Sequence, residues 1–159
     1  MQSTVKQSYV ESNEVVQPGD LNIHGTLFGG RLVSLMDKVA AISAYRHALN
    51  PVVTLSIDHL LFKEPVPLGS QIRLQAVVNR SFNSSMEVGV KVSAYTPKSP
   101  LEPIHVCSAY FTFVAFNENK EKIQLNEILP ESEIEIRRFN NAKLRRKARF
   151  SLSEQLKKA

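Results

Sequence analysis

One aspartate in a long apolar segment is the residue of this chain best suited to catalysis. Asp37 has Val33 four residues before it and Ala41 four residues after it, so on a helix its neighbours are small and apolar. Burial in such surroundings raises the pKa of a carboxyl group toward the range useful to a general base. We therefore predict that Asp37 activates a water molecule. The alternative is a structural carboxylate held by a backbone amide or a basic side chain, because an unpartnered buried charge is costly.

Polar and glycine residues shortly before Asp37 could complete such a site. Gly29 and Gly30 stand where the helical pattern begins, and the free N–H groups and the dipole of a helix start favour negative charge. They could stabilise an oxyanion, or they could simply allow close packing of the helix against a sheet. Asn22 could orient a water molecule or hold a carbonyl group through its amide, or it could only form a turn.

The cysteine and the histidines offer less chemistry. Cys107 lies in an apolar run, which predicts a buried structural thiol and not a nucleophile. One cysteine cannot form an internal disulfide, and the N-terminal segment lacks the apolar core of a signal peptide, so we expect a cytoplasmic protein. The histidines lack the paired spacing of a metal site and are expected on the surface or in loops: His24, His47, His59 and His105.

The net charge of +5 comes from one end of the chain. Between Arg137 and Lys158 there are nine Lys or Arg and one acid, so the remaining sequence has eleven basic and fourteen acidic residues. A local basic segment can bind a nucleic acid, an anionic membrane or a phosphorylated cofactor. We do not expect a nucleic acid, because the segment has only Phe139 and Phe150 as aromatic residues and no recognised motif. No membrane span is expected, since the apolar runs are far shorter than the roughly 20 residues that one requires.

A single long helix must carry Asp37 and the two glycines. Apolar residues recur at three- and four-residue steps over about residues 27–49 and cover nearly the whole circumference, which is typical of a helix enclosed by other elements. Pro51 then ends the pattern. Residues 5–17 predict an irregular or edge strand, which stops at a turn over 18–20.

Four strands are expected after the helix, because apolar and polar residues alternate with a period of two. They cover about residues 53–61, 71–78, 86–93 and 104–116. The second and third form a hairpin around a turn at 83–85, and a proline-rich loop over 97–103 precedes the fourth, an inner strand that is apolar on both faces. A basic surface helix over 131–159 follows, in which Ser132 and Glu135 have capping-box spacing. The fold class is α+β, with an antiparallel sheet curled around one helix.

Residues 22–30 (NIHGTLFGG), followed by Met36 and Asp37, resemble the acyl-CoA hydrolase branch of the hotdog-fold thioesterases. Further matches follow in the expected order: Val53-Thr54 to Asp58, Phe62 to Val66, Gly69, and Ser84 to Val88. The resemblance covers about residues 10–117. It implies a single hotdog domain, which we expect over residues 1–125. The charge pattern adds a basic C-terminal helical extension over 126–159, which the resemblance does not cover closely. The resemblance also implies hydrolysis of acyl-CoA to a free carboxylic acid and CoA, without a metal or redox cofactor.

The resemblance further implies how the site is built. Asp37 would act as a general base toward water, with direct nucleophilic attack as the less favoured variant, while Asn22 and Gly30 would hold the thioester. Thr54 is similar to a family position that lines the site, or it is an ordinary strand residue. In hotdog dimers this Asn and this Asp typically meet across the subunit interface. A homodimer is therefore expected, and a trimer of dimers is the assembly that the family implies.

Coenzyme A carries several phosphate groups, which arginine can clamp and turn amides can bind. The candidate CoA-binding residues lie around the hairpin turn and in the basic tail: Arg80, Ser84, Ser85, Arg145, Arg146 and Lys147. Each could instead be an ordinary solvated residue of a turn or of a helix face.

Two other interpretations use the same fold. Hotdog dehydratases usually have an Asp-His pair early on the helix, but no histidine follows Asp37 before His47. A non-catalytic acyl-CoA sensor needs no carboxylate at Asp37 and usually carries a DNA-binding module, of which this sequence has no signature. We therefore favour the hydrolase.

Overall fold

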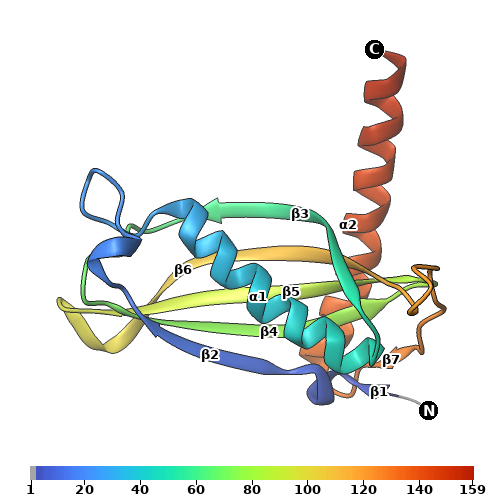
Figure 1. Cartoon of the computed structure of the whole chain (residues 1–159), viewed down its shortest axis with the longest axis horizontal. Helices are drawn as coiled ribbons and strands as arrows, with labels where there is room; N and C mark the ends of the chain where they lie inside the picture. The colour runs from blue at the N-terminus through green and yellow to red at the C-terminus, as the bar shows by residue number, and fades with distance from the viewer. Residues whose placement is uncertain (1–2) are drawn as a thin grey trace.

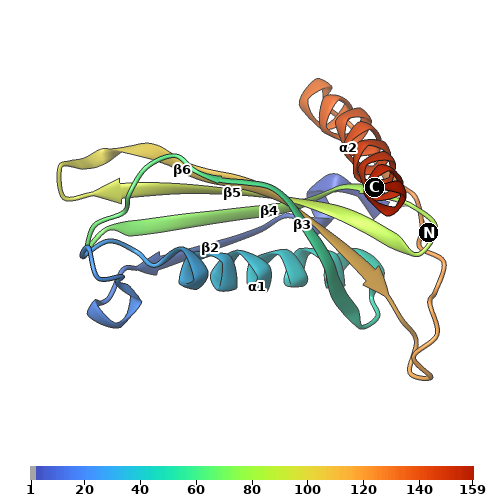
Figure 2. The same ribbon diagram turned by 90° about the horizontal axis from the view of Figure 1, so that it is seen from above.

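A five-stranded antiparallel sheet lies between two helices in the computed structural model, which describes residues 3–159 (Figure 1). The strand order is β2-β4-β5-β6-β3. The strands are β2 (Val10–Val15), β3 (Val52–Phe62), β4 (Gln71–Ser81), β5 (Ser85–Thr96) and β6 (Ser99–Ala115). Helix α1 (Gly29–Ala48) covers one face of the sheet and α2 (Glu133–Lys158) lies over the other, as Figure 2 shows. The predicted α+β architecture is confirmed.

Helix α1 and the sheet enclose the core between them. The buried side chains of the helix recur at three- and four-residue steps: Leu32, Leu35, Met36, Val39, Ala40, Ser43, Ala44, His47 and Ala48. The helix lies within two residues of the predicted range 27–49 at both ends, and Leu49 caps it in the left-handed conformation with a φ of 51°. Its outer side is uncovered, since Ile42 and Tyr45 are 49% and 54% exposed. The sequence predicts that other elements enclose this helix, but within a single chain its outer side stays uncovered.

The edge strand β3 also leaves apolar side chains in contact with solvent. Five of them are exposed: Val53, Leu55, Ile57, Leu61 and Phe62. This strand pairs with β6 on one side and is the last strand of the sheet on the other. An uncovered sheet edge with a contiguous apolar surface is a typical site of protein association.

The hairpin of β4 and β5 forms as predicted, but β6 is longer than expected. It begins at Ser99, so the prediction of a loop over 97–103 is wrong for most of that range. The reason lies in the sheet: β3 ends at Phe62 opposite Cys107, and residues 99–105 therefore have a neighbouring strand on one side only. Prolines at such an edge cost few ladder hydrogen bonds.

A small parallel pair ties the N-terminus to the segment before α2. Strand β1 (Ser3–Thr4) pairs with β7 (Ile128–Leu129). The 3-10 helices η1 (Val5–Ser8) and η2 (Pro18–Asp20) stand on either side of β2. The two-residue strands have no measurable periodicity, so the sequence does not predict them.

The predicted C-terminal helix is present and begins at a capping box. Ser132 Oγ accepts a hydrogen bond from the Glu135 N–H, and the Glu135 carboxylate accepts one from the Ser132 N–H. Two ion pairs then dock α2 on the sheet: Arg145 with Glu87, and Arg149 with Asp58. Across residues 3–159, no helix combines the length and the apolar character that a bilayer crossing requires.

We expect Arg145→Ala to destabilise the protein by about 3–5 kcal/mol, because it leaves the Glu87 carboxylate buried without its partner. Glu87 is only 3% exposed, and Arg145 bonds both of its carboxylate oxygens. The free energy of unfolding is measured by denaturant titration at one fixed protein concentration. Lys157→Ala is the matched control, since it breaks the exposed Lys157–Glu154 pair and should change stability by less than about 1 kcal/mol. Equal effects of the two variants would contradict this account of α2 docking.

Candidate active site

Asp37 and Thr54 form one half of the candidate site. The Thr54 hydroxyl donates a hydrogen bond of 2.7 Å to Asp37 Oδ1. Asp37 lies midway along α1 and Thr54 near the start of β3, and both side chains are half-buried. Among residues 3–159, no Lys, Arg or His forms an ion pair with Asp37. The carboxylate is thus oriented by a neutral hydroxyl and not neutralised by a base, which leaves Oδ2 available to accept a proton.

Asn22 belongs to a turn between η2 and α1. Its Oδ1 accepts hydrogen bonds from the backbone N–H groups of His24 (2.9 Å) and Thr26 (3.2 Å). Its Nδ2 donates to Thr26 Oγ1 at 3.0 Å. The turn-forming role considered for Asn22 is therefore present. A primary amide has two N–H donors, so one remains for a ligand.

The start of α1 combines open backbone amides with close aromatic packing. Phe28 is the N-cap and provides no capping side chain, so the first-turn N–H groups have no side-chain acceptor there. A Cβ on Gly30 would lie 2.7 Å from the Phe28 ring, and one on Gly29 would lie 3.2 Å from the Phe62 ring. The glycines therefore serve close packing and at the same time leave this helix end open to an anion.

A pocket of about 310 Å³ lies beside the Asn22 turn. Asn22 and Gly29 line it together with apolar side chains that include Leu32, Phe62 and Val106. Asp37 is not among its lining residues. It lies seven residues beyond Gly30 on the same helix, which corresponds to about 10 Å along the axis. Within residues 3–159, no hydrogen bond or shared pocket joins the Asn22 half to the Asp37 half.

Four of the candidate CoA-binding residues come together around the β4–β5 turn. The guanidinium carbons of Arg80 and Arg146 lie 5.7 and 4.5 Å from the centroid of the Phe82 ring. Ser84 and Ser85 form the last part of the turn and the first residue of β5. The structure thus places Arg146 beside Arg80 and the two turn residues, although it lies more than 60 residues later in the sequence.

The other two tail candidates have different environments. Arg145 bonds Glu87 at 3.0 and 2.6 Å, and its guanidinium carbon lies 3.5 Å from the centroid of the Tyr110 ring. Its role in this structure is to dock α2, which the sequence does not predict because Glu87 lies 58 residues away. Lys147 is exposed.

Cys107 is a buried thiol, as predicted. It is 0% exposed, and burial raises the pKa of Cys107 to about 11. Its Sγ lies 3.6 Å from Met36 Sδ. Such a thiol is unreactive at neutral pH. Within the described part of the chain, no three His, Cys, Asp or Glu side chains gather closely enough to hold a metal ion.

The prediction that every histidine is on the surface or in a loop is wrong for His47. It is 5% exposed in the last turn of α1, where its Nε2–H donates to the Asn126 carbonyl oxygen at 3.0 Å. Its Nδ1 has no hydrogen-bond partner, and burial lowers the pKa of His47 below its ordinary value of 6.5. The sequence pattern does not predict that His47 is buried, because the carbonyl group that accepts its hydrogen bond belongs to Asn126, in a distant loop.

We expect His47 to make the fold less stable in acid. In the unfolded chain the imidazole takes up a proton as the pH falls through 6.5, while the folded chain resists it because the pKa of His47 is lowered. The free energy of unfolding has its full value above pH 6.5. It falls below that pH by up to about 1.4 kcal/mol for each pH unit. Denaturant titrations between pH 5 and pH 8 measure this slope. His47→Gln should reduce it, whereas His24→Gln, at an exposed residue, should not.

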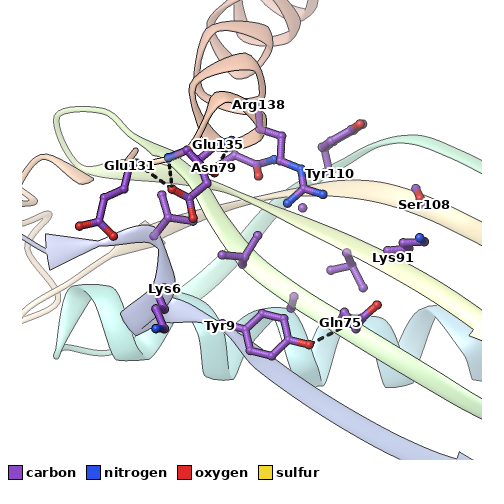
Figure 3. Close-up of a pocket in the computed structure, with 16 residues that line it drawn as sticks. Lys6, Tyr9, Gln75, Asn79, Lys91, Ser108, Tyr110, Glu131, Glu135 and Arg138 are labelled. Carbon is purple, nitrogen blue, oxygen red and sulfur yellow. Dashed lines mark hydrogen bonds between the residues drawn. The ribbon is translucent and has the colours of Figure 1, made fainter. Parts of the chain in front are cut away.

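A second cavity, of about 560 Å³, lies on the α2 side of the sheet (Figure 3). Basic side chains from three elements reach it, namely Lys6 of η1, Lys91 of β5 and Arg138 of α2. At the edge of this cavity, the Tyr9 hydroxyl accepts a hydrogen bond of 2.9 Å from the Gln75 side chain. Its lining contains none of the residues that the sequence marks for catalysis, and it lies on the opposite face of the sheet from α1.

Known proteins resemble this chain in both sequence and structure. Residues 24–100 match the model of the thioesterase superfamily. The uncharacterized acyl-CoA thioester hydrolase YkhA of Bacillus subtilis is 36% identical over 86% of this chain and 79% of its own length. The acyl-CoA hydrolase of Staphylococcus aureus, solved with butyryl-CoA, CoA and CoA disulfide, is 31% identical, with a TM-score of 0.88 over 99% of this chain and 98% of that chain.

An acyl-CoA thioesterase solved as an apo hexamer is 30% identical, with a TM-score of 0.91 over 96% of this chain and 97% of that chain. These similarities extend over nearly the whole chain, α2 included. Together with the sheet and the central helix, they identify the chain as a member of the hotdog-fold acyl-CoA thioesterase family and hence as a thioester hydrolase.

Proposed function

We propose that this protein hydrolyses acyl-CoA thioesters at a site shared by two subunits. Asp37 and Thr54 of one subunit would face Asn22 and the start of α1 of the other. The observation that carries the proposal is the separation of the two halves within one chain, about 10 Å along α1. A second copy can close this distance, whereas a rearrangement within α1 cannot.

The Staphylococcus aureus enzyme supports this choice of residues. Three of its structures carry alanine in place of an asparagine, an aspartate and a threonine. Along that chain the aspartate follows the asparagine by 15 residues and the threonine follows the aspartate by 17. The same two separations relate Asn22, Asp37 and Thr54.

The uncovered apolar surface supports a homodimer. The outer side of α1 and the edge of β3 present Ile42, Tyr45, Val53, Leu55 and Ile57 to solvent. A second copy is the expected cover, because closed symmetric assemblies bury the same patch on both subunits. The apo hexamer among the similar structures supports a further step to a trimer of dimers.

The proposed reaction begins when Asp37 takes a proton from a water molecule that attacks the thioester carbonyl carbon. Thr54 holds Oδ1 of the carboxylate, so Oδ2 would receive the proton. The developing oxyanion would lie against the Asn22 amide and the Gly30 N–H of the other subunit. When the carbon–sulfur bond breaks, the proton passes to the departing CoA sulfur. The products are one carboxylic acid and one CoA thiol.

The substrate would lie across surfaces already described. The apolar walls of the 310 Å³ pocket suit the acyl chain or the pantetheine arm. Arg80 and Arg146, beside the amides of Ser84 and Ser85, suit the phosphates of CoA. Lys147 would add charge to the same surface, and Arg145 would hold α2 in place beneath it.

A thiol-release assay over acyl-CoAs of increasing chain length tests the proposal. A disulfide reagent reports free CoA, and the protein itself adds little background because Cys107 is buried with a pKa of about 11. We expect CoA and carboxylic acid to appear in equal amounts for at least one chain length. Absence of CoA release from every acyl-CoA would refute the proposed function.

A further inference from the structure

The turn that carries Asn22 is fixed in shape by its own hydrogen bonds, but they do not fix its place relative to α1. The Asn22 side chain bonds only His24 and Thr26, both within the same turn. The segment leaves the sheet after β2 and enters α1 without itself becoming a strand of the sheet (Figure 1). Its far end is held by the Leu27 N–H, which donates to the Val66 carbonyl at 2.7 Å. Its near end is held by the Val16 N–H, which donates to the Ser70 carbonyl at 2.9 Å, and it needs a separate attachment to α1.

Asp20, two residues before Asn22, makes that attachment. Its Oδ1 accepts a hydrogen bond of 2.9 Å from Arg31 Nε, in the first turn of α1. Its Oδ2 accepts one of 2.9 Å from the Gln17 N–H, and its carbonyl oxygen accepts one of 2.8 Å from the Phe28 N–H. One residue thus joins the N-cap of η2, the N-cap of α1 and the first turn of α1.

We propose that Asp20 is a positioning residue of the thioesterase site, which holds the Asn22 amide at a fixed place relative to the open amides of the α1 start. The inference rests on the proposed function, because it matters for catalysis only if these two sets of donors share one oxyanion. Asp20 itself would touch neither water nor substrate. Arg31 is the second member of the clamp, since its guanidinium carries the bond to the helix.

The charge state of the clamp is suited to neutral pH. The Gln17 N–H, and then the Arg31 guanidinium, lower the pKa of Asp20, so it stays ionised throughout the range in which a thioesterase is assayed. The side chain of Asp20 is 17% exposed and that of Arg31 is 41% exposed. A surface ion pair of this kind contributes little to global stability. We therefore expect the Asp20–Arg31 pair to fix the local position of the turn and not to stabilise the whole fold.

Asp20→Asn keeps the size of the side chain and removes its charge, which weakens the bond to Arg31. We expect kcat to fall by about 10- to 100-fold, because small displacements of oxyanion donors are costly in the transition state. KM should change much less, since the donors act mainly after binding. Arg31→Lys, which keeps the charge, should lose less than Asp20→Asn. Glu154→Gln is the matched control, because it breaks the exposed Glu154–Lys157 pair and should leave kcat unchanged.

A double-mutant cycle with Asn22→Ala decides whether Asp20 acts through Asn22. If it does, Asp20→Asn should lower kcat in the wild-type background and have almost no further effect in the Asn22→Ala background. Equal fold-losses in both backgrounds would overturn the proposal, because they would mean that Asp20 acts on stability or on another group.

Hydrogen exchange separates this inference from the proposed function. The Phe28 N–H donates to the Asp20 carbonyl oxygen, so its exchange rate reports on the link between the turn and α1. Asp20→Asn should speed this exchange, while an amide in the middle of β5 is unaffected. This measurement needs no enzyme activity. Unchanged exchange of the Phe28 amide would overturn the clamp even if the wild type is an active thioesterase, and a clamp confirmed in an inactive protein would refute the function alone.

Discussion

Replacement of Asp37 by alanine should lower kcat for acyl-CoA hydrolysis by about 10²- to 10⁴-fold, the usual contribution of a general base. The variant keeps the helix, because alanine favours helical geometry and Asp37 makes only the bond to Thr54. The measurement is the rate of CoA thiol release at saturating substrate. Activity within a few-fold of the wild type would exclude Asp37 from the chemistry.

Two further variants refine this result. Thr54→Val preserves the shape of the side chain but removes the hydroxyl that holds Asp37 Oδ1, and it should cost about tenfold in kcat. Glu154→Gln is a control on an exposed part of α2, where it breaks only the pair with Lys157. Melting temperature and oligomer size are compared for every variant, so a loss of assembly is not mistaken for a loss of catalysis.

Mixing two inactive variants should restore activity. Asp37→Ala subunits retain Asn22, and Asn22→Ala subunits retain Asp37, so a mixed dimer contains one intact site and one doubly defective site. If equal amounts assort at random, half of the dimers are mixed, and the expected activity is about a quarter of the wild-type level. Each variant alone should be at least about 100-fold slower than the wild type. Restoration would therefore be large.

Co-expression of the two variants, followed by the thiol-release assay, makes the comparison. The control mixes Asp37→Ala subunits with subunits that carry both replacements, which cannot form an intact site in any arrangement. A site contained within one subunit predicts that both mixtures stay at the level of the single variants. That outcome would contradict the composite site while leaving the hydrolase assignment in place.

Local patterns predict much of this fold. The apolar period over residues 27–49 predicts α1, alternation predicts the β4–β5 hairpin, and the spacing of Ser132 and Glu135 predicts the start of α2. Each of these signals depends on residues close together in the chain. The proline-rich segment 97–103 is wrongly predicted as a loop. Proline in a strand loses a ladder hydrogen bond only where a neighbouring strand would accept it, and β3 ends before it reaches this segment.

The candidate site is predictable in its parts and not in its arrangement. Asn22, Gly30 and Asp37 can be selected from residue type and motif, and their spacing on one helix puts Gly30 and Asp37 about 10 Å apart. It does not show that Thr54 bonds Asp37 or where the Asn22 turn lies. Asp20 escapes selection from the sequence because its importance lies in the bond to Arg31, eleven residues later. An acid in a turn is too common to stand out without that contact.

Short-range periodicity and breakers such as Pro51 are enough to predict which helix carries Asp37, where that helix begins and ends, and which strands form a hairpin. Which ionic residues are engaged, and which surfaces remain uncovered, depends on how the elements pack together. Arg145 and Arg146 are adjacent and alike in sequence, yet one bonds Glu87 and the other lies beside Phe82. Neighbours on a helix point about 100° apart, so their partners depend on what the fold places beneath each of them.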